Sequence, residues 1–129
     1  MKKVLICGDR EWDNQTLMEH IISKIPLDKY DTIIHGNFKG ADRMAGKIGL
    51  EKGFCIVPYP AEWKTMGFNV DSVVNRTMID EGKPDLVLAF HNNIINSKGT
   101  INLINIASKE GTKVILINES DDYSKLEIT

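Results

Sequence analysis

Short runs of apolar residues alternate along this chain with longer stretches in which apolar residues recur every three or four positions. The short runs predict strands at residues 4–7, 32–34, 55–57, 85–90 and 114–117. The periodic stretches between them predict helices that end near Pro26, Gly53, Gly82 and Gly111. Because the runs are continuously apolar, the strands are expected to be parallel and covered on both faces. The sequence therefore predicts an α/β fold, a single Rossmann-like three-layer sandwich with a mainly parallel five-stranded sheet.

The first helix and the end of the chain are less sharply defined than the rest of the pattern. Asp13 or Asn14 can cap the first helix, whose apolar positions continue to Ile25. Residues 118–129 are acidic and weakly patterned. A terminal element docked through Tyr123 and Leu126 and a frayed tail both fit such a segment. No repeat or linker interrupts the chain, and we expect one domain over residues 1–129.

Composition narrows the classes of partner. Of the 129 residues, 42% are hydrophobic and 26% are charged, and the formal net charge is −2. Nucleic-acid binders usually carry a clear basic excess, so a nucleic-acid partner is disfavoured. No apolar run approaches the roughly 18 residues that a membrane span needs. The basic start leads directly into the first strand, whose apolar run ends at Cys7 and Gly8. These features predict a cytoplasmic protein without a membrane partner.

Cysteine and histidine positions give no sign of a metal site. Cys7 and Cys55 each lie in an apolar run, which predicts buried, reduced thiols. His20, His35 and His91 are scattered and lack metal-ligand spacing. We therefore predict neither a metal nor a cofactor.

The segment 35–43 lies where the second strand turns into the second helix. Gly36 and Gly40 allow a tight turn and a close approach of the backbone to a ligand. The N-terminus of the following helix favours an anion, and Lys39 and Arg43 add positive charge. This combination fits a phosphate cradle, although glycines beside basic residues also occur in plain turns.

Other charged residues are expected at the same edge, because ligands of open parallel sheets bind beyond the carboxyl ends of the strands. Arg10 follows the first strand, and Lys98 follows the fourth strand just before Gly99 and Thr100. With Lys39 and Arg43 they can surround the same phosphate groups, which points to a small anionic metabolite. Each cation taken alone also fits an ordinary solvated surface charge.

The connection after the third strand, residues 58–68, is long and contains two prolines and three aromatic residues. Long ordered connections often act as lids or binding loops, but this one can also simply cover the edge of the sheet. Trp63 can stack on a base or pack against the sheet. Glu62 places a carboxylate at the predicted site.

Five motifs then occur in order and at fitting distances. They are Gly8-Asp9-Arg10, His35-Gly36-x-x-x-Gly40-Ala41-Asp42, Pro60-Ala61-x-Trp63, Asn75-x-x-Met78 and Pro84-Asp85-Leu86-Val87-Leu88-Ala89-Phe90. Over roughly residues 3–117 the chain resembles the YspA-like, YpsA-related branch of the SLOG superfamily, long described as a domain of unknown function.

The resemblance implies a Rossmann-like fold related to LOG-type nucleoside-monophosphate phosphoribohydrolases and to the DNA-processing protein DprA. It also implies a nucleotide or nucleotide-derived ligand, a bacterial or phage setting and, through helix pairing, a homodimer. By motif, the implied ligand-facing residues are Gly8, Arg10, Gly36, Gly40, Asp42, Asn75, Gly99 and Thr100. The full set of predicted ligand residues adds His35, Lys39, Arg43, Trp63, Arg76 and Lys98. Asn75 also fits a polar residue on the exposed side of its helix.

The chain departs from its relatives at three places. The loop before Gly99-Thr100 is asparagine-rich and longer, whereas the family's loop is usually glycine-rich. Relatives often have Arg before the Asn of the third-helix motif, whereas this chain has Val74 there and Arg76 on the other side. A helix turns about 100° per residue, so Arg76 points elsewhere. LOG-type enzymes carry a Glu at the position of Leu103, and its loss argues against their hydrolytic mechanism.

These observations favour a protein that binds a nucleotide-like ligand, as a sensor or a sequestering module. The alternative is a nucleotide N-glycosidase, in which Asp42 or Glu62 supplies the carboxylate that an oxocarbenium-like transition state requires, with Asp9 nearby. Asp42 also has a structural interpretation, because an acidic residue in the first turn of a helix complements the helix dipole.

Overall fold

The strands of the sheet all run in one direction. The computed structural model describes residues 1–60 and 70–129, and in them the sheet has five strands in the order β3-β2-β1-β4-β5. Their bounds are β1 Lys2–Gly8, β2 Tyr30–His35, β3 Cys55–Pro58, β4 Leu86–Phe90 and β5 Lys113–Ile117. Every neighbouring pair is parallel. The predicted Rossmann-like α/β architecture is confirmed, and the described sheet is wholly parallel.

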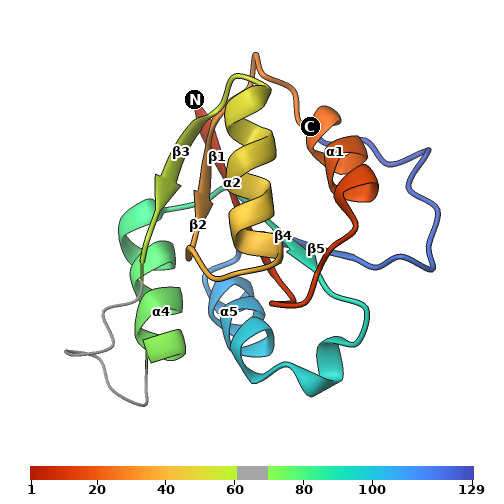
Figure 1. Ribbon diagram of the computed structural model, residues 1–129. Helices are drawn as coiled ribbons and strands as arrows, with labels where there is room; N and C mark the ends of the chain where they lie inside the picture. Colours follow the sequence, from red (N-terminus) through yellow and green to blue (C-terminus); the bar gives the residue numbers. More distant parts are fainter. Residues whose placement is uncertain (61–69) are drawn as a thin grey trace.

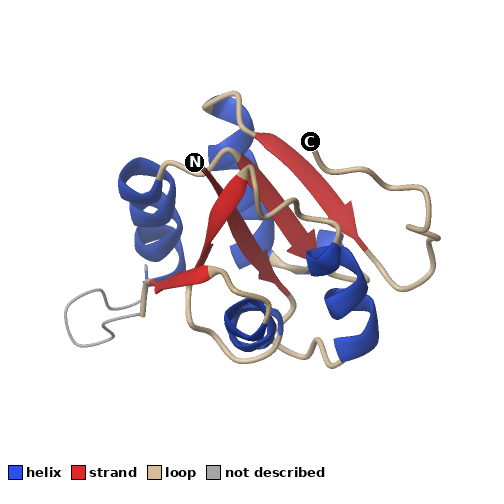
Figure 2. Ribbon diagram, turned by 90° about the horizontal axis from the view of Figure 1, so that it is seen from above, coloured by secondary structure: helices blue, strands red, loops and turns tan. Residues whose placement is uncertain are grey.

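Helices cover both faces of this sheet. Their bounds are α1 Gln15–Ser23, α2 Ala41–Glu51, α4 Val70–Gly82 and α5 Lys98–Lys109, with a short 3-10 turn, η2, at Ile94–Asn96. Helices α1 and α2 lie on one face, and α4 and α5 lie on the other (Figures 1 and 2). The result is the expected three-layer sandwich.

The central strand β1 shows why the strands read as continuous apolar runs. Val4 and Ile6 pack into the core under α1 and α2. Leu5 and Cys7 point the other way, into the core under α4 and α5. Successive side chains of a strand face opposite sides, so a strand between two helical layers must be apolar at every position.

The order of the strands places a switch point between β1 and β4. From β1 the chain continues to β2 and β3 on one side of the sheet, and later to β4 and β5 on the other. Gly8 at the end of β1 is paired with Phe90 at the end of β4. Connections leave these two ends in opposite directions, which opens a crevice where α/β proteins bind ligands.

The structure corrects two expectations. Helix α1 ends at Ser23 instead of continuing to Ile25, because the N–H of Ile25 donates to the carbonyl of Ile22, three residues back, in a turn that leads into Pro26. Cys55 was expected to be buried but is exposed, since β3 is an edge strand. The prediction of a buried Cys7 is confirmed.

The structure also shows which residue caps α1 and how the terminal segment is placed. Asn14, not Asp13, caps α1, and its Oδ1 accepts a hydrogen bond from the N–H of Leu17 at 3.0 Å. Residues 118–129 form neither helix nor strand, yet they dock on the core. Tyr123 donates from its hydroxyl to the carbonyl of Leu116 at 3.2 Å, and Ile128 is buried. In the described part of the chain, no helix has the length and apolar character to cross a membrane.

Candidate functional site

A cavity of about 420 Å³ opens at the carboxyl ends of β1 and β4. This volume lies within the range of small-molecule sites. The cavity is lined by residues that follow these two strands, by the start of α5, and by side chains of α2 and α4. They are Cys7, Gly8, Asp9, Arg10, Phe38, Asp42, Asn75, Met78, His91, Asn96, Ser97, Lys98, Gly99, Thr100 and Leu103. We call this cavity the switch cleft.

Gly8 forms the floor of the switch cleft and allows β1 and β4 to approach closely. A Cβ at Gly8 would lie 2.1 Å from the carbonyl oxygen of Phe90, which is too close for any other residue. The N–H of Asp9 then donates to the same carbonyl at 2.8 Å. The backbone of the Gly8-Asp9 step is therefore locked to the end of β4, and it directs the Asp9 side chain into the switch cleft.

Asp9 and His91 face each other across the floor of the cleft. Asp9 Oδ1 accepts from the N–H of Glu11 at 2.9 Å, and Oδ2 lies 3.9 Å from His91 Nε2. His91 Nδ1 accepts from the N–H of Asn93 at 2.9 Å, so the neutral ring carries its proton on Nε2. The backbone N–H of His91 is fixed by the carbonyl of Ile117. Backbone contacts thus hold both side chains with one polar atom of each directed at the other.

The N-terminus of α5 also lines the cleft. Ser97 caps the helix, since its Oγ accepts from the N–H of Thr100 at 3.2 Å and its carbonyl accepts from Ile101. The N–H groups of Lys98 and Gly99 come first in the helix and have no intrahelical acceptor. The positive end of the helix dipole and the charge of Lys98 make this end suitable for an anion.

Asn75 of α4 holds the start of α5 in place. Its side chain is buried, and its Nδ2 donates to the carbonyl of Gly99 at 2.9 Å and to Asn102 Oδ1 at 3.1 Å. Thr100 Oγ1 lies 3.5 Å from the carbonyl oxygen of Gly8, at the limit of a hydrogen bond. The interpretation of Asn75 as an exposed residue is therefore wrong, and the amide instead ties α4 to α5.

The α2 side of the cleft is built around a buried carboxylate. Asp42 Oδ2 accepts from the N–H of Gly36 at 2.8 Å. Burial, and secondly the charge of Asp42, raise the pKa of the Cys7 thiol well above its usual value, which favours the neutral thiol. Above them the Arg10 guanidinium lies 4.5 Å from the centroid of the Phe38 ring, a cation–π contact.

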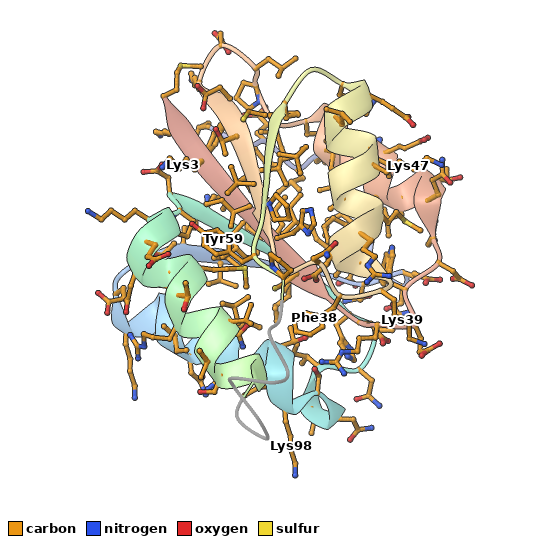
Figure 3. All side chains as sticks on the ribbon, turned by 60° about the vertical axis from the view of Figure 1, so that its left-hand side comes forward. Lys3, Phe38, Lys39, Lys47, Tyr59 and Lys98 are labelled. Atoms are coloured by element: carbon orange, nitrogen blue, oxygen red, sulfur yellow. The ribbon has the colours of Figure 1, made fainter. Side chains whose placement is uncertain are left out.

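A second cavity, of about 350 Å³, adjoins the switch cleft and shares Arg10 and Phe38 with it. Its lining residues are Arg10, Gly36, Asn37, Phe38, Lys39, Arg43 and Pro60, and we call it the basic hollow. Lys39 Nζ lies 2.8 Å from Glu11 Oε1, and Arg43 Nε donates to the carbonyl of Asn37 at 2.9 Å. Both cations are thus engaged within the protein. In Figure 3, Phe38, Lys39 and Lys98 lie toward the same end of the molecule, away from Lys3.

The predicted phosphate cradle at the start of α2 is closed by the protein itself. Gly40 has φ +84°, and a Cβ there would lie 2.4 Å from the carbonyl oxygens of Asp9 and Arg10. The N–H of Ala41 donates to the carbonyl of Asp9 at 3.0 Å, and that of Arg43 to the carbonyl of Phe38 at 3.2 Å. Two N–H groups at the start of α2, those of Ala41 and Arg43, are therefore bound to backbone oxygens.

His35 at the end of β2 is a structural histidine. Its Nδ1 accepts from the N–H of Asn37 at 2.9 Å, and its Nε2 packs against Gly46, where a Cβ would lie only 2.7 Å away. Burial, together with the nearby charge of Arg43, lowers the pKa of His35 to about 4. The ring is consequently neutral at ordinary pH and supports the turn above it.

The structure divides the predicted ligand residues among three locations. Those lining the switch cleft are Gly8, Arg10, Asp42, Asn75, Lys98, Gly99 and Thr100. Those lining the basic hollow are Arg10, Gly36, Lys39 and Arg43. His35, Gly40 and Arg76 line neither cavity, and the Arg76 guanidinium lies 3.6 Å from both Asp80 and Glu110. Glu62 and Trp63 lie outside the described residues.

Sequence reasoning did not select Phe38, His91 or Ser97, which line the switch cleft. For His91 a signal was present, because it directly follows the most apolar strand and so stands at the carboxyl edge. Among the residues that the structure describes, no cluster of three His, Cys, Asp or Glu side chains is arranged to hold a metal ion.

Comparison with known proteins places this geometry in context. The model of the YspA, cpYpsA-related SLOG family matches residues 2–66, half of the 129-residue chain. The X-ray structure of DNA processing protein A (DprA) from Streptococcus pneumoniae matches with a TM-score of 0.69 and 18% sequence identity. The match covers 90% of this chain and 50% of that one, so this chain spans about half the length of the DprA chain. Such a likeness shows the fold alone. No curated protein matches the chain.

Proposed function

The chain belongs to the YspA, cpYpsA-related SLOG family, and from this we propose that its switch cleft binds a nucleotide or nucleotide-derived small ligand. The observation that carries the proposal is the position of the cleft. It lies at the switch point between β1 and β4, and the N-terminus of α5 stands at one end of it. Nucleotides bind doubly wound sheets at this point, with their phosphates on a helix N-terminus.

The positions of Asp9 and of the α5 N-terminus in the cleft lining support one orientation of the ligand. Lys98 and the first N–H groups of α5 favour a phosphate. Asp9, on the loop after β1, repels a phosphate and can accept a hydrogen bond from a sugar or base. We expect the phosphate over α5 and the nucleoside toward β1.

Binding without turnover, as in a sensor or a sequestering module, is the simpler function. Leu103, which takes the place of the Glu of LOG-type enzymes, lines the cleft and is buried. A leucine supplies neither a proton nor a charge for the reaction. The absence of a carboxylate at this position favours binding over hydrolysis.

The test is a set of affinity measurements by calorimetry with a panel of nucleoside mono-, di- and triphosphates and dinucleotides. Lys98→Glu places a negative charge at the anion end and should weaken binding at least tenfold, about 1.4 kcal/mol. Lys109→Glu makes the same charge change in the last turn of the same helix and should leave the affinity within about twofold. The proposal fails if no nucleotide binds, or if the two variants weaken binding equally.

Nucleotide N-glycosidase activity is the second candidate, and the carboxylates of Asp9 and Asp42 in the cleft favour it. A positive oxocarbenium-like transition state is stabilised by such charges. The same panel can be assayed for free base by chromatography. Asp42→Asn removes the charge but leaves an oxygen that can accept from Gly36, so a loss of turnover in a folded variant would identify Asp42 as the catalytic carboxylate. Glu62→Gln tests the other predicted carboxylate in the same assay.

A further inference from the structure

The spacing between the side chains of Asp9 and His91 indicates which chemical group of the ligand they can bind. The distance of 3.9 Å between Asp9 Oδ2 and His91 Nε2 is too long for a direct hydrogen bond, which requires about 2.7–3.2 Å. An oxygen atom placed between the two, at about 2.8 Å from each, satisfies both. It would donate to the carboxylate and accept from the Nε2–H. A hydroxyl group can do both at once, whereas an ionised phosphate oxygen or an ammonium group cannot.

The pair is held ready for such a group. The side chain of His91 is only 10% exposed, and Nε2 has no closer hydrogen-bond partner among the described residues. In the same part of the chain, no fully buried side-chain nitrogen or oxygen lacks a partner, so Nε2 is reached from the switch cleft, which His91 lines. Asp9 is 32% exposed, and its other oxygen is occupied by the N–H of Glu11.

We infer that Asp9 and His91 together recognise a sugar hydroxyl of the ligand, so that the switch cleft selects ribonucleotides over nucleotides that lack that hydroxyl. The inference rests on the proposed function and adds the chemical class of the ligand. Because the pair stands on the β1–β4 side of the cleft and Lys98 at the start of α5, a nucleotide whose phosphate lies on α5 presents its ribose to the pair. A carboxylate beside the sugar also excludes a second phosphate at that position.

The experiment measures the affinity of the four ribonucleoside 5′-monophosphates and of their 2′-deoxy and 3′-deoxy counterparts by calorimetry. For the wild type we expect one of the two deoxy forms to bind about tenfold to a hundredfold more weakly than the ribonucleotide, the usual effect of losing a hydrogen bond to a charged group. Asp9→Asn and His91→Gln should weaken binding of the ribonucleotide. Asp13→Asn, an exposed carboxylate in the same loop, serves as the matched control.

The decisive quantity is the difference between the effect of the substitution on ribonucleotide affinity and its effect on deoxynucleotide affinity. Asp9→Asn should lower the affinity for the ribonucleotide. It should leave nearly unchanged the affinity for the deoxy form that the wild type binds weakly, because the hydroxyl that contacts Asp9 is already absent from it. A purely structural role of Asp9 would weaken all forms by the same factor and would overturn the inference. Equal binding of all three sugars to the wild type would also overturn it while leaving the proposed function intact. If none of these nucleotides binds, and no nucleotide of the wider panel binds either, the proposed function fails as well.

Discussion

The switch cleft and the basic hollow lie side by side at the same edge of the sheet, yet they differ in how their polar groups are used. Around the basic hollow the groups already satisfy one another, as in the contacts of Lys39 with Glu11 and of Arg43 with the Asn37 carbonyl. Among the described residues of the switch cleft, His91 Nε2 has no partner closer than Asp9 Oδ2 at 3.9 Å, and the N–H groups of Lys98 and Gly99 have no intrahelical acceptor. By sequence alone, the segment beside the basic hollow concentrates two glycines and two cations within residues 35–43.

This difference shows that a glycine-rich turn before a helix has two possible uses. Glycine allows backbone to approach a ligand, but it equally allows backbone to approach backbone. Gly40 serves the second use, since the carbonyls of Asp9 and Arg10 occupy the space in front of it. The first turn of α2 is therefore a joint that fixes the loop after β1, and through it the position of Asp9 in the switch cleft.

Gly40→Ala is the most direct test of the difference between the two cavities. The new Cβ would meet two carbonyl oxygens at 2.4 Å, at a residue with φ +84°. Because neither oxygen belongs to a flexible side chain, we expect the free energy of unfolding to fall by about 3–5 kcal/mol in urea denaturation. Gly53→Ala is the matched control, because Gly53 has φ +99° and nothing within 4 Å of the added atom. It should cost about 1 kcal/mol.

Similar losses in the two variants would mean that the joint between α2 and the β1 loop yields easily. The start of α2 would then be free to open toward a ligand, and the distinction between the two cavities would disappear. A selective loss at Gly40 supports the view that this glycine is structural.

Sequence patterns predicted the elements well because each depends on neighbours in the chain. The apolar residues of β1 and the cap at Asn14 are examples, since burial on both faces and capping leave local signatures. The order of strands depends on packing between distant segments. That order put Cys55 on an exposed edge and brought Asp9 next to His91, 82 positions later in the chain.

Contacts between distant segments also explain why the predicted ligand residues are divided between two cavities. Lys39 and Lys98 were predicted to surround one phosphate because both follow strands of the same sheet. The sequence does not reveal that Glu11 engages Lys39, because this contact joins two loops 28 positions apart. It also does not reveal which helix start is covered by another loop. Charge and glycine content predicted the correct edge of the sheet but not which cavity on it remains open.

A second prediction uses the buried His35 to test whether the turn at the end of β2 has a structural role. The pKa of His35 is about 4 in the folded protein against 6.5 for a free histidine, so the unfolded state binds a proton in a range where the folded state does not. The free energy of unfolding should therefore fall as the pH drops from about 6.5 toward about 4, by about 2 kcal/mol between about pH 7 and pH 5.

Urea denaturation of wild type and of His35→Asn at these two pH values measures this contribution. The asparagine Oδ1 can still accept from the N–H of Asn37, but it does not titrate. The variant should therefore lose about 2 kcal/mol less than the wild type over the same interval. Equal losses in both proteins would show that His35 is accessible to protons in the folded state and is not part of a closed turn.

The smallest expected effect concerns Lys39 and tests whether the basic hollow is separate from the switch cleft. Lys39 and Glu11 form an exposed ion pair, with 64% and 77% of their side chains accessible. Lys39→Ala should change the free energy of unfolding by less than about 0.5 kcal/mol, and the affinity for a nucleotide held in the switch cleft by less than about twofold, because at this exposure salt screens the charge. Glu11→Gln, which frees the lysine, is the matched variant. If it strengthens binding several-fold while Lys39→Ala weakens it, the lysine reaches the ligand once released, and the basic hollow extends the switch cleft into a longer site for a ligand with a second phosphate.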